Sequence, residues 1–384
     1  MSLSSQSVMS GMLITDWDVD NKHFFYAGSC SEGVLQGAES PHLLALRFLE
    51  DGVILCGKKV IPSTYRALDI LYGRNPWNKG IPFIFITNGG GTSEDDRAQV
   101  LSRLLSRDIK PSQILQSHTV MKGYVGNDSG PDNLRDEQIL VLGGVLDELR
   151  HVAKNYGFRN VYTTQDILAW NPDIWPFHTL TQPELNHTVR HDFSTAPITS
   201  IFVMHDPRNW ALDIQILTDV LLSHPHPLGS CPPRYKWGQK GAKLFFCNPD
   251  LLWKGGFDMP RYGQGAFRAA FQATFKAATG SEYPYVGFGK PNKITFDYGK
   301  SMLRKQWEDS GWQLDDKNAR LPKVFMVGDN PESDIAGANA AGWCSLLVKT
   351  GVYDSDGAPP KHTPTAIVND VEEAVQWAVK SVLP

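Results

Sequence analysis

One stretch near the C-terminal end of this chain joins a buried-strand pattern to an acidic turn and a helix of small residues. The run Val324–Gly328 stops at Asp329, and Asp334 follows five residues later. An apolar β-type run that stops at Gly-Asp places the acid at the carboxyl edge of a parallel strand, where open α/β sheets bind ligands. Because Mg²⁺ prefers carboxylates, water and substrate phosphates, we expect Asp329 and Asp334 to form a magnesium site. An acidic helix N-terminus favoured by the helix dipole is the plainer alternative.

A second buried-strand pattern ends in a hydroxyl, an amide and three glycines. Residues 81–86 lead into Thr87, Asn88 and Gly89, and Ser93 then opens a helix with capping chemistry. Glycines let backbone N–H groups close on an anion, and Thr87 and Asn88 can donate hydrogen bonds to phosphate oxygens. We therefore expect these three residues to bind phosphate, although a plain β-to-α turn accounts for the same pattern.

Further polar residues lie at predicted turns. Lys290 stands between a glycine and Pro291, so it is excluded from a helix interior and its ammonium is free to contact an acid or a ligand. Asn248 and Asp250 follow the last strand of the middle third, at a predicted hinge from which they can face the site when two domains close. A solvated lysine and a simple turn are the respective alternatives.

The middle third of the chain alternates strands and helices. Strands are predicted near 138–143, 198–204 and 243–247, with a helix over 210–223. This alternation is typical of a second α/β domain. We assign residues 41–117 and 248–384 to a core domain, residues 118–247 to an inserted domain, and residues 1–40 to an irregular N-terminal segment. Within the inserted domain, Asp206 and Arg208 are candidates for substrate selection or for a solvated loop.

Composition excludes several classes of protein. The net charge of −4 comes with no basic run, so we expect no nucleic-acid partner. The five cysteines are scattered and odd in number, which favours a reducing compartment over zinc or disulfides. No apolar run reaches membrane-spanning length, so we expect a soluble, intracellular protein without membrane insertion. The first forty residues contain Lys22 among five acids, which disfavours a mitochondrial transit peptide and favours the cytoplasm.

The three motifs resemble, in order and spacing, motifs two, three and four of the haloacid dehalogenase-like (HAD) hydrolase superfamily. The motifs are Thr87-Asn88, Gly289-Lys290-Pro291, and Gly328-Asp329 continuing to Ala338. The inserted α/β unit resembles the C2-type cap of subfamily IIA, and longer strings such as Asp206–Gln215 resemble the cat eye syndrome critical region protein 5-like branch. The resemblance covers the chain from about residue 42 onward. It implies an α/β fold with a Rossmann-like core, a parallel sheet with helices on both faces, and an inserted C2-type cap domain.

The resemblance also implies Mg²⁺-dependent hydrolysis of a small phosphomonoester. In this superfamily the first Asp of an Asp-x-Asp-Gly motif attacks phosphorus and the second is the general acid and base. Here Leu49-Glu50-Asp51-Gly52 fits that motif with Asp51 as acid/base and Leu49 at the nucleophile position. A leucine neither attacks phosphorus nor binds Mg²⁺, so we expect the phosphatase activity to be impaired.

Three explanations for Leu49 stay open. Asp16-Trp-Asp18 imitates the motif, but the expected flap and helix do not follow it. Glu50 is a second acid, although strand alternation turns it away from the face that Asp51 uses unless a bulge re-aims it. An incorrect translated sequence that carries Leu in place of Asp is the third.

By resemblance, then, the expected catalytic residues are Asp51, Thr87 and Lys290, and the expected partner is a small phosphorylated metabolite. The resemblance is compatible with a homodimer. Relatives of this branch are often mitochondrial, which implies a mitochondrial location. The alternative function is a non-catalytic phosphate-binding or scaffolding pseudophosphatase. A nicotinamide oxidoreductase is disfavoured because no Gly-x-Gly-x-x-Gly follows the first strand.

Overall fold

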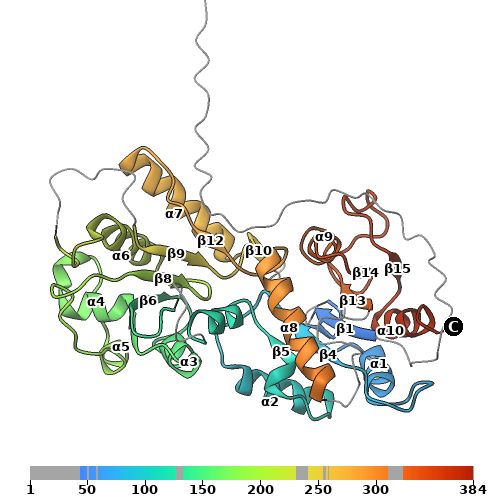
Figure 1. The fold of residues 1–384 in the computed structure, drawn as a ribbon. Helices are drawn as coiled ribbons and strands as arrows, with labels where there is room; N and C mark the ends of the chain where they lie inside the picture. Colours follow the sequence, from blue (N-terminus) through green and yellow to red (C-terminus); the bar gives the residue numbers. More distant parts are fainter. Residues whose placement is uncertain are drawn as a thin grey trace, which may run out of the picture. The chain divides into compact units, whose positions relative to one another are not determined.

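A six-stranded parallel sheet carries the residues singled out by the sequence. The computed structural model describes residues 44–49, 52–57, 59–126, 133–230, 241–253, 257, 259–309 and 323–383, and in the first strand it describes the side chains of Leu46 and Phe48 only. The strand order is β15-β14-β13-β1-β4-β5 (Figure 1). The bounds are β1 Leu44–Leu49, β4 Phe83–Ile86, β5 Ile114–Leu115, β13 Lys323–Gly328, β14 Cys344–Val348 and β15 Ala366–Val368.

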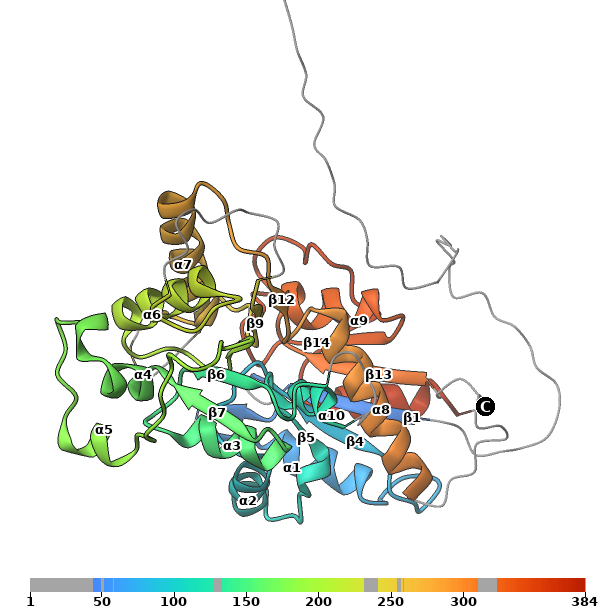
Figure 2. The same ribbon diagram turned by 60° about the vertical axis from the view of Figure 1, so that its left-hand side comes forward.

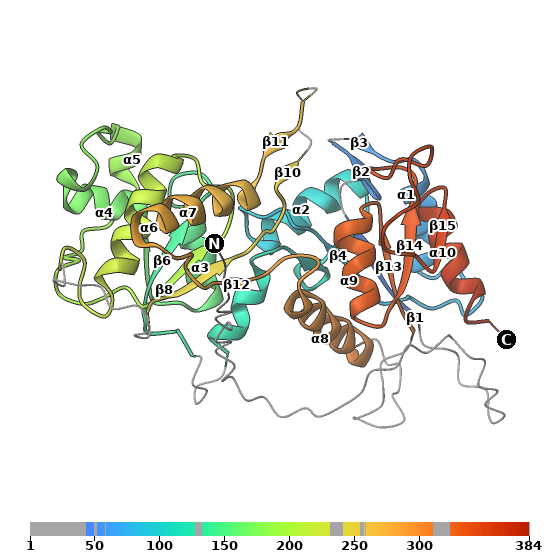
Figure 3. The same cartoon turned by 90° about the horizontal axis from the view of Figure 1, so that it is seen from above.

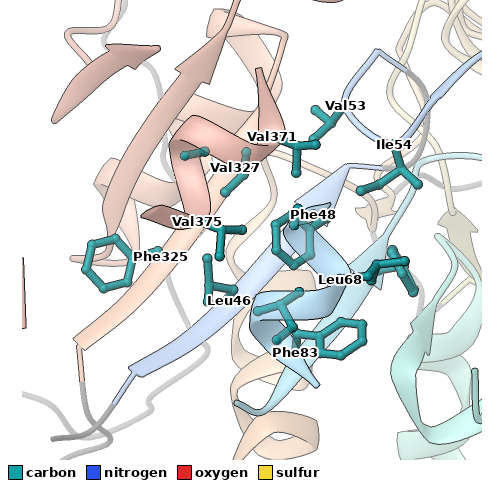
Figure 4. Packing of buried hydrophobic residues seen from close by; sticks show 14 of the residues in the cluster. Leu46, Phe48, Val53, Ile54, Leu68, Phe83, Phe325, Val327, Val371 and Val375 are labelled. Carbon is teal, nitrogen blue, oxygen red and sulfur yellow. The ribbon is translucent and has the colours of Figure 1, made fainter. Parts of the chain in front are cut away.

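Alternate side chains of these strands face two separate layers of helices, as expected for a parallel sheet buried on both faces. On one face, aromatic and branched side chains pack against α1 (Ser63–Leu71), α2 (Glu94–Leu105) and α10 (Val371–Lys380). Figure 4 shows Leu46 and Phe48 of β1 among Phe83, Phe325 and Val327 on this face. The apolar side of α1, which includes Ala67, Leu68 and Leu71, is thus turned to the sheet.

The opposite face of the sheet packs on α8 (Lys293–Asp309) and α9 (Ala336–Ala340). Here Ile84 and Ile86 of β4 and Met326 of β13 contact Phe296 and Leu303 of α8 through one buried cluster. Figure 2 shows α8 crossing this side of the sheet beside β4. Because described helices cover both faces, a ligand is expected at the strand ends, where open α/β sheets bind.

A second, five-stranded parallel sheet has the order β12-β9-β8-β6-β7. Its strands are β6 Gln138–Leu142, β7 Asn160–Thr163, β8 Ser200–Val203, β9 Lys243–Phe246 and β12 Val286–Gly287. The helices of this unit are α3 Glu148–Tyr156, α4 Thr164–Trp170, α5 Gln182–Asn186, α6 Trp210–Ser223 and α7 Gln264–Thr279. The strands and the helix predicted in the middle third are present, and α6 has the bounds expected from the sequence. The predicted fold class, a Rossmann-like core with an inserted α/β cap, is thus confirmed.

The boundary predicted after residue 247 differs from the observed packing. Phe267, Phe271 and Phe275 of α7 are buried in the cluster of the second sheet, and β12 pairs with β9. Residues 264–287 therefore pack with the inserted unit and not with the core sheet. An apolar helix pattern does not show against which sheet the helix packs, so the boundary predicted after residue 247 left α7 and β12 with the core.

Two antiparallel hairpins complete the fold. One joins β2 (Leu55–Cys56) to β3 (Lys59–Val60), and the other joins β10 (Leu252–Trp253) to β11 (Arg261–Tyr262). Both are visible in Figure 3, where the β10–β11 hairpin extends away from the helices. Among the described residues, no helix combines the length and the apolar character needed to cross a membrane.

Candidate active site

The carboxyl ends of three neighbouring strands meet at one edge of the core sheet. Leu49, the last residue of β1, pairs with Ile86 of β4, and Phe48 pairs with Val327 of β13. Thr87 and Asp329 directly follow these two neighbouring strands. The chain runs from β1 to β4 and β5 on one side and returns to β13, β14 and β15 on the other. Position 49 therefore lies at the switch point of the sheet, where doubly wound folds bind ligands.

The motif that contains position 49 is only partly described. The backbone of Leu49 belongs to β1, whereas its side chain, Glu50 and Asp51 lie outside the described residues. The acid/base role expected of Asp51 stays a prediction, as do the alternatives at Asp16 and Glu50.

Asp329 is a buried carboxylate with one free oxygen. Its side chain belongs to a residue that is 3% exposed, and Oδ2 accepts a 2.7 Å hydrogen bond from the Val352 N–H group. Oδ1 is buried and has no hydrogen-bond partner within the described residues. Burial, followed by the charge of Asp334, raises the pKa of Asp329 to about 6. An orphaned, desolvated carboxylate oxygen is the kind of atom that a bound cation satisfies.

Two glycines enclose the Asp329 carboxylate. A Cβ atom at Gly351 would lie 1.8 Å from Oδ2 of Asp329, and one at Gly52 would lie 2.2 Å from the same atom. Gly52 also has a φ of 81°, which favours glycine. Gly52 belongs to the predicted motif, whereas no sequence pattern singled out Gly351, which is 22 residues past Asp329 in the chain.

Lys290 and Asp334 form a buried ion pair. The Lys290 Nζ donates to Oδ1 of Asp334 at 2.6 Å, and the residues are 1% and 0% exposed. Oδ2 of Asp334 accepts the Asn330 N–H group at 3.1 Å. Each oxygen of Asp334 already accepts a hydrogen bond, so its predicted part in the magnesium site, which we expect to be indirect through water or Lys290, stays a prediction. The observed contact positions the Lys290 ammonium, which a solvated loop lysine would not do.

The polar groups that follow β4 form hydrogen bonds with other groups of the protein. Oγ1 of Thr87 accepts the Gly89 N–H group at 2.9 Å, which leaves the hydroxyl proton of Thr87 to donate elsewhere. Asn88 is buried, and its Nδ2 donates to Oδ1 of Asp250 at 3.0 Å and to the Lys290 carbonyl at 3.1 Å. Its Oδ1 accepts the Lys290 N–H group at 2.7 Å. Both amide hydrogens of Asn88 and the N–H group of Gly89 are engaged within the protein, and the phosphate contacts expected of these two residues stay predictions.

Asp250 joins this cluster from the segment after β9. Its carboxylate accepts from Asn88, and its own N–H group donates to Oδ1 of Asn248 at 2.8 Å. Burial is the main cause that raises the pKa of Asp250, while the Lys290 charge lowers it. Asp250 is therefore brought to the strand ends, whereas Asn248 supports the turn. The predicted roles of both in substrate binding stay predictions.

The charges of the described cluster do not balance. Three carboxylates, Asp250, Asp329 and Asp334, share one ammonium, that of Lys290, and its charge acts on Asp250 and Asp329 as well as on its bonded partner. A divalent cation at the free oxygen of Asp329 would relieve this excess. Within the described ranges no three His, Cys, Asp or Glu side chains converge to hold a metal unaided. Asp329 fits one ligand of such an ion, which also takes phosphate oxygens and water as ligands.

A buried network that the sequence did not indicate holds the glycine turn after β4. Nε2 of His118 accepts the Gly91 N–H group at 3.3 Å, and Nδ1 lies 2.8 Å from the Tyr156 hydroxyl. Tyr156 in turn donates to Oε1 of Glu94 at 2.6 Å. Complete burial lowers the pKa of His118 to about 4, so the ring stays neutral and can accept at Nε2. No spacing rule marks a lone histidine for such a role.

Comparison with known proteins identifies the family. The family model described as haloacid dehalogenase-like hydrolase matches residues 50–159, and a second, described as HAD-hydrolase-like, matches residues 287–374. A mitochondrial hydrolase of Saccharomyces cerevisiae is 38% identical over 86% of this chain and 94% of its own length. A cardiolipin synthase (CMP-forming)/mitochondrial hydrolase fusion protein of Schizosaccharomyces pombe is 35% identical over 87% of this chain. The chain spans 52% of the length of that fusion protein.

Solved structures agree with the fold. The chain is similar to a p-nitrophenyl phosphatase from Archaeoglobus fulgidus, with a TM-score of 0.58, 17% identity, and coverage of 88% of this chain and 100% of that one. It is also similar to a glycerol phosphate phosphatase from Mycobacterium tuberculosis in complex with magnesium, with a TM-score of 0.53, 19% identity, and coverage of 87% and 77%. This protein belongs to the haloacid dehalogenase-like hydrolase family, as its motifs predicted.

Proposed function

We propose that this protein has the site of a Mg²⁺-dependent phosphomonoester hydrolase in which position 49 disables the covalent step. The observation that carries the proposal is the meeting of position 49, Thr87 and Asp329 at one sheet edge, with the Lys290 ammonium beside them. The magnesium complex of a similar phosphatase supports the choice of cation. The core is assigned to residues 41–117 and 288–384 and a C2-type cap to the segment between.

The proposed chemistry assigns one task to each residue. In a complete site a carboxylate at position 49 forms a bond to phosphorus while the bond to the leaving oxygen breaks, and Asp51 gives that oxygen a proton. Asp51 then takes a proton from water as the water displaces the enzyme carboxylate. The Thr87 hydroxyl donates to a phosphoryl oxygen, and the Lys290 ammonium balances phosphate charge. Asp329 would hold Mg²⁺, which supplies Lewis-acid stabilisation of the phosphoryl oxygens when bound.

A second candidate function is favoured by Leu49 itself. With no carboxylate at the nucleophile position, the remaining groups suit phosphate binding without turnover, as in a non-catalytic phosphate-binding or scaffolding protein.

For the location we propose the mitochondrion, on the strength of the name of the Saccharomyces relative. A small phosphorylated metabolite is the proposed ligand.

The test compares the purified protein with Leu49→Asp for release of nitrophenol from p-nitrophenyl phosphate in the presence of Mg²⁺. The double variant Leu49→Asp, Asp329→Asn is the matched blank, because it keeps the added carboxylate and lacks the metal ligand. We expect turnover in Leu49→Asp alone. Turnover by the unmodified protein that Asp329→Asn abolishes would overturn the alignment at Leu49 and direct attention to Asp16 or Glu50. No turnover by any form, with phosphate protecting the protein against unfolding, would favour the non-catalytic function.

A further inference from the structure

A cavity of about 270 Å³ lies within the inserted unit, apart from every residue of the site described above. Ligand pockets for drug-sized molecules have volumes of roughly 300–1,000 Å³, so this one suits a smaller molecule. All of its lining residues lie between Val141 and Asp213. The groups that matter for recognition are Gly143, Gly144, Leu146, Gln165, Glu184 and Arg208.

The cavity occupies the switch point of the second sheet. The chain passes from β6 to its neighbour β7, and it then crosses to β8 on the other side of β6. The lining residues Gly143–Leu146 follow β6, and Arg208 follows β8. Thr163 is the last residue of β7, and Thr164 and Gln165 begin α4 directly after it. The crevice beyond the carboxyl ends of strands at such a point is where open α/β sheets bind ligands. The proposed phosphate chemistry lies at the switch point of the core sheet, and none of the residues given a task in that chemistry lines this cavity.

The loop after β6 has an unusual backbone conformation. Gly143 and Gly144 have φ values of 102° and 72°, and Leu146 has a φ of 50°. A Cβ at Gly143 would lie 2.1 Å from the His205 carbonyl oxygen, so the backbone is held in close contact there. A leucine in the left-handed region is strained, and such residues cluster at active sites and ligand-binding loops, where the surrounding structure holds them in place. This loop forms one wall of the cavity.

Two polar groups of the cavity have unused bonding capacity. Nε of Arg208 donates to the Gly144 carbonyl at 3.3 Å, and within the described ranges its guanidinium has no acidic partner. Arg208 also lies just before α6, whose N-terminus adds positive potential. Oε1 of Gln165 is buried and has no hydrogen-bond partner among the described residues. The acids of the wall are engaged, since Asp213 accepts from Thr164 and Glu184 from Thr181.

We propose that this cavity is a second small-molecule site, which binds a compact metabolite through an anionic group at Arg208 and a hydroxyl or amine at Gln165. The anionic group is a carboxylate or a phosphate. Binding here is independent of position 49 and of the proposed metal, because no residue of the cavity belongs to that cluster.

The experiment uses hydrogen–deuterium exchange on the full chain with malate, inorganic phosphate or glycerol. Malate tests a carboxylate with a hydroxyl, phosphate tests the other anion, and glycerol is the neutral control. We expect at least one anion to protect residues 143–149 and 207–213, and glycerol to leave them unchanged. Phosphate bound at the catalytic edge would instead protect residues 87–92, so the two sites are distinguishable. Absence of protection at 143–149 by both anions at millimolar concentration would overturn the proposal.

Variants separate recognition from structure. Arg208→Gln should weaken the protecting anion about tenfold or more, as expected for loss of a charge-assisted hydrogen bond. Arg190→Gln is the matched control, since Arg190 is an exposed arginine of the same unit that does not line the cavity. Gln165→Leu should weaken malate, because it removes the buried oxygen that has no partner among the described residues. It also removes the 3.5 Å hydrogen bond from Nε2 of Gln165 to Glu184, so its stability is measured beside its affinity. Equal protection in Arg208→Gln and in Arg190→Gln would refute the role of Arg208 and with it the proposed site.

Discussion

Replacing Asp329 by Asn should stabilise the metal-free protein at alkaline pH. The pKa of Asp329 is about 6 in the folded chain, against a value of 3.8 for an ordinary aspartate. A raised carboxyl pKa means that the folded state binds the proton more tightly than the unfolded state does. Stability is therefore lost as the pH rises from the pKa of the unfolded chain through the pKa of the folded chain. The shift corresponds to about 3 kcal/mol at pH 8 and about half of that at pH 5. An asparagine removes this charge penalty. The resulting gain in stability is reduced by the cost of burying the asparagine amide.

The matched variant is Asp334→Asn, which should have the opposite effect. Asp334 is as deeply buried as Asp329, but its charge is paired with the buried Lys290 ammonium at 2.6 Å. Removing one partner of a buried ion pair costs about 3–5 kcal/mol where no other charge compensates the one that remains. The Asp250 and Asp329 carboxylates, which also interact with the Lys290 charge, should reduce this cost without replacing the lost hydrogen bond. Two substitutions of the same kind, five residues apart, thus differ in sign because one carboxylate is paired and the other is not.

Urea unfolding in EDTA at pH 8 and at pH 5, followed by far-ultraviolet circular dichroism, measures both effects. We expect Asp329→Asn to exceed the unmodified protein in stability at pH 8, with a smaller difference at pH 5, and Asp334→Asn to fall below it. Excess Mg²⁺ should raise the stability of the unmodified protein and leave Asp329→Asn unchanged. If Asp329→Asn is less stable than the unmodified protein at pH 8 without metal, Asp329 is not an uncompensated charge and the inferred cation site is refuted.

Two further substitutions test other contacts. Gly351→Ala places a Cβ 1.8 Å from Oδ2 of Asp329 and must displace that carboxylate, so it should weaken Mg²⁺ binding at least about tenfold, as measured by calorimetry. Gly123→Ala is the control, because a Cβ there meets nothing within 4 Å, and it should leave Mg²⁺ binding unchanged. Equal affinities in the two variants would show that the glycine enclosure has no effect on the carboxylate. Tyr156→Phe removes the hydroxyl that bridges His118 and Glu94, so we expect a loss of about 1–3 kcal/mol in urea unfolding, and an unchanged midpoint would mean that this buried network contributes nothing to stability.

Local features of the chain were predictable because neighbouring residues cause them. Ser93 accepts from the Asp96 N–H group at the start of α2, as its capping pattern indicated, and α6 begins and ends where its apolar pattern does. The strand ends at Thr87 and Asp329 follow from apolar runs that stop at polar turns. Motif spacing then sufficed to predict the family and the layered α/β fold.

The tertiary structure decided which of these polar groups are free. Asn88 and Lys290 are 202 residues apart, and only their contact shows that the Asn88 amide is consumed within the protein. The same holds for Gly351 against Asp329, for His118 against Gly91, and for α7, which packs on the second sheet. The chain therefore determined its strands, caps and chemistry-bearing turns through short-range preferences. Which oxygen remains open to a cation was fixed by packing between distant segments, since hydrogen bonds and burial depend on neighbours in space.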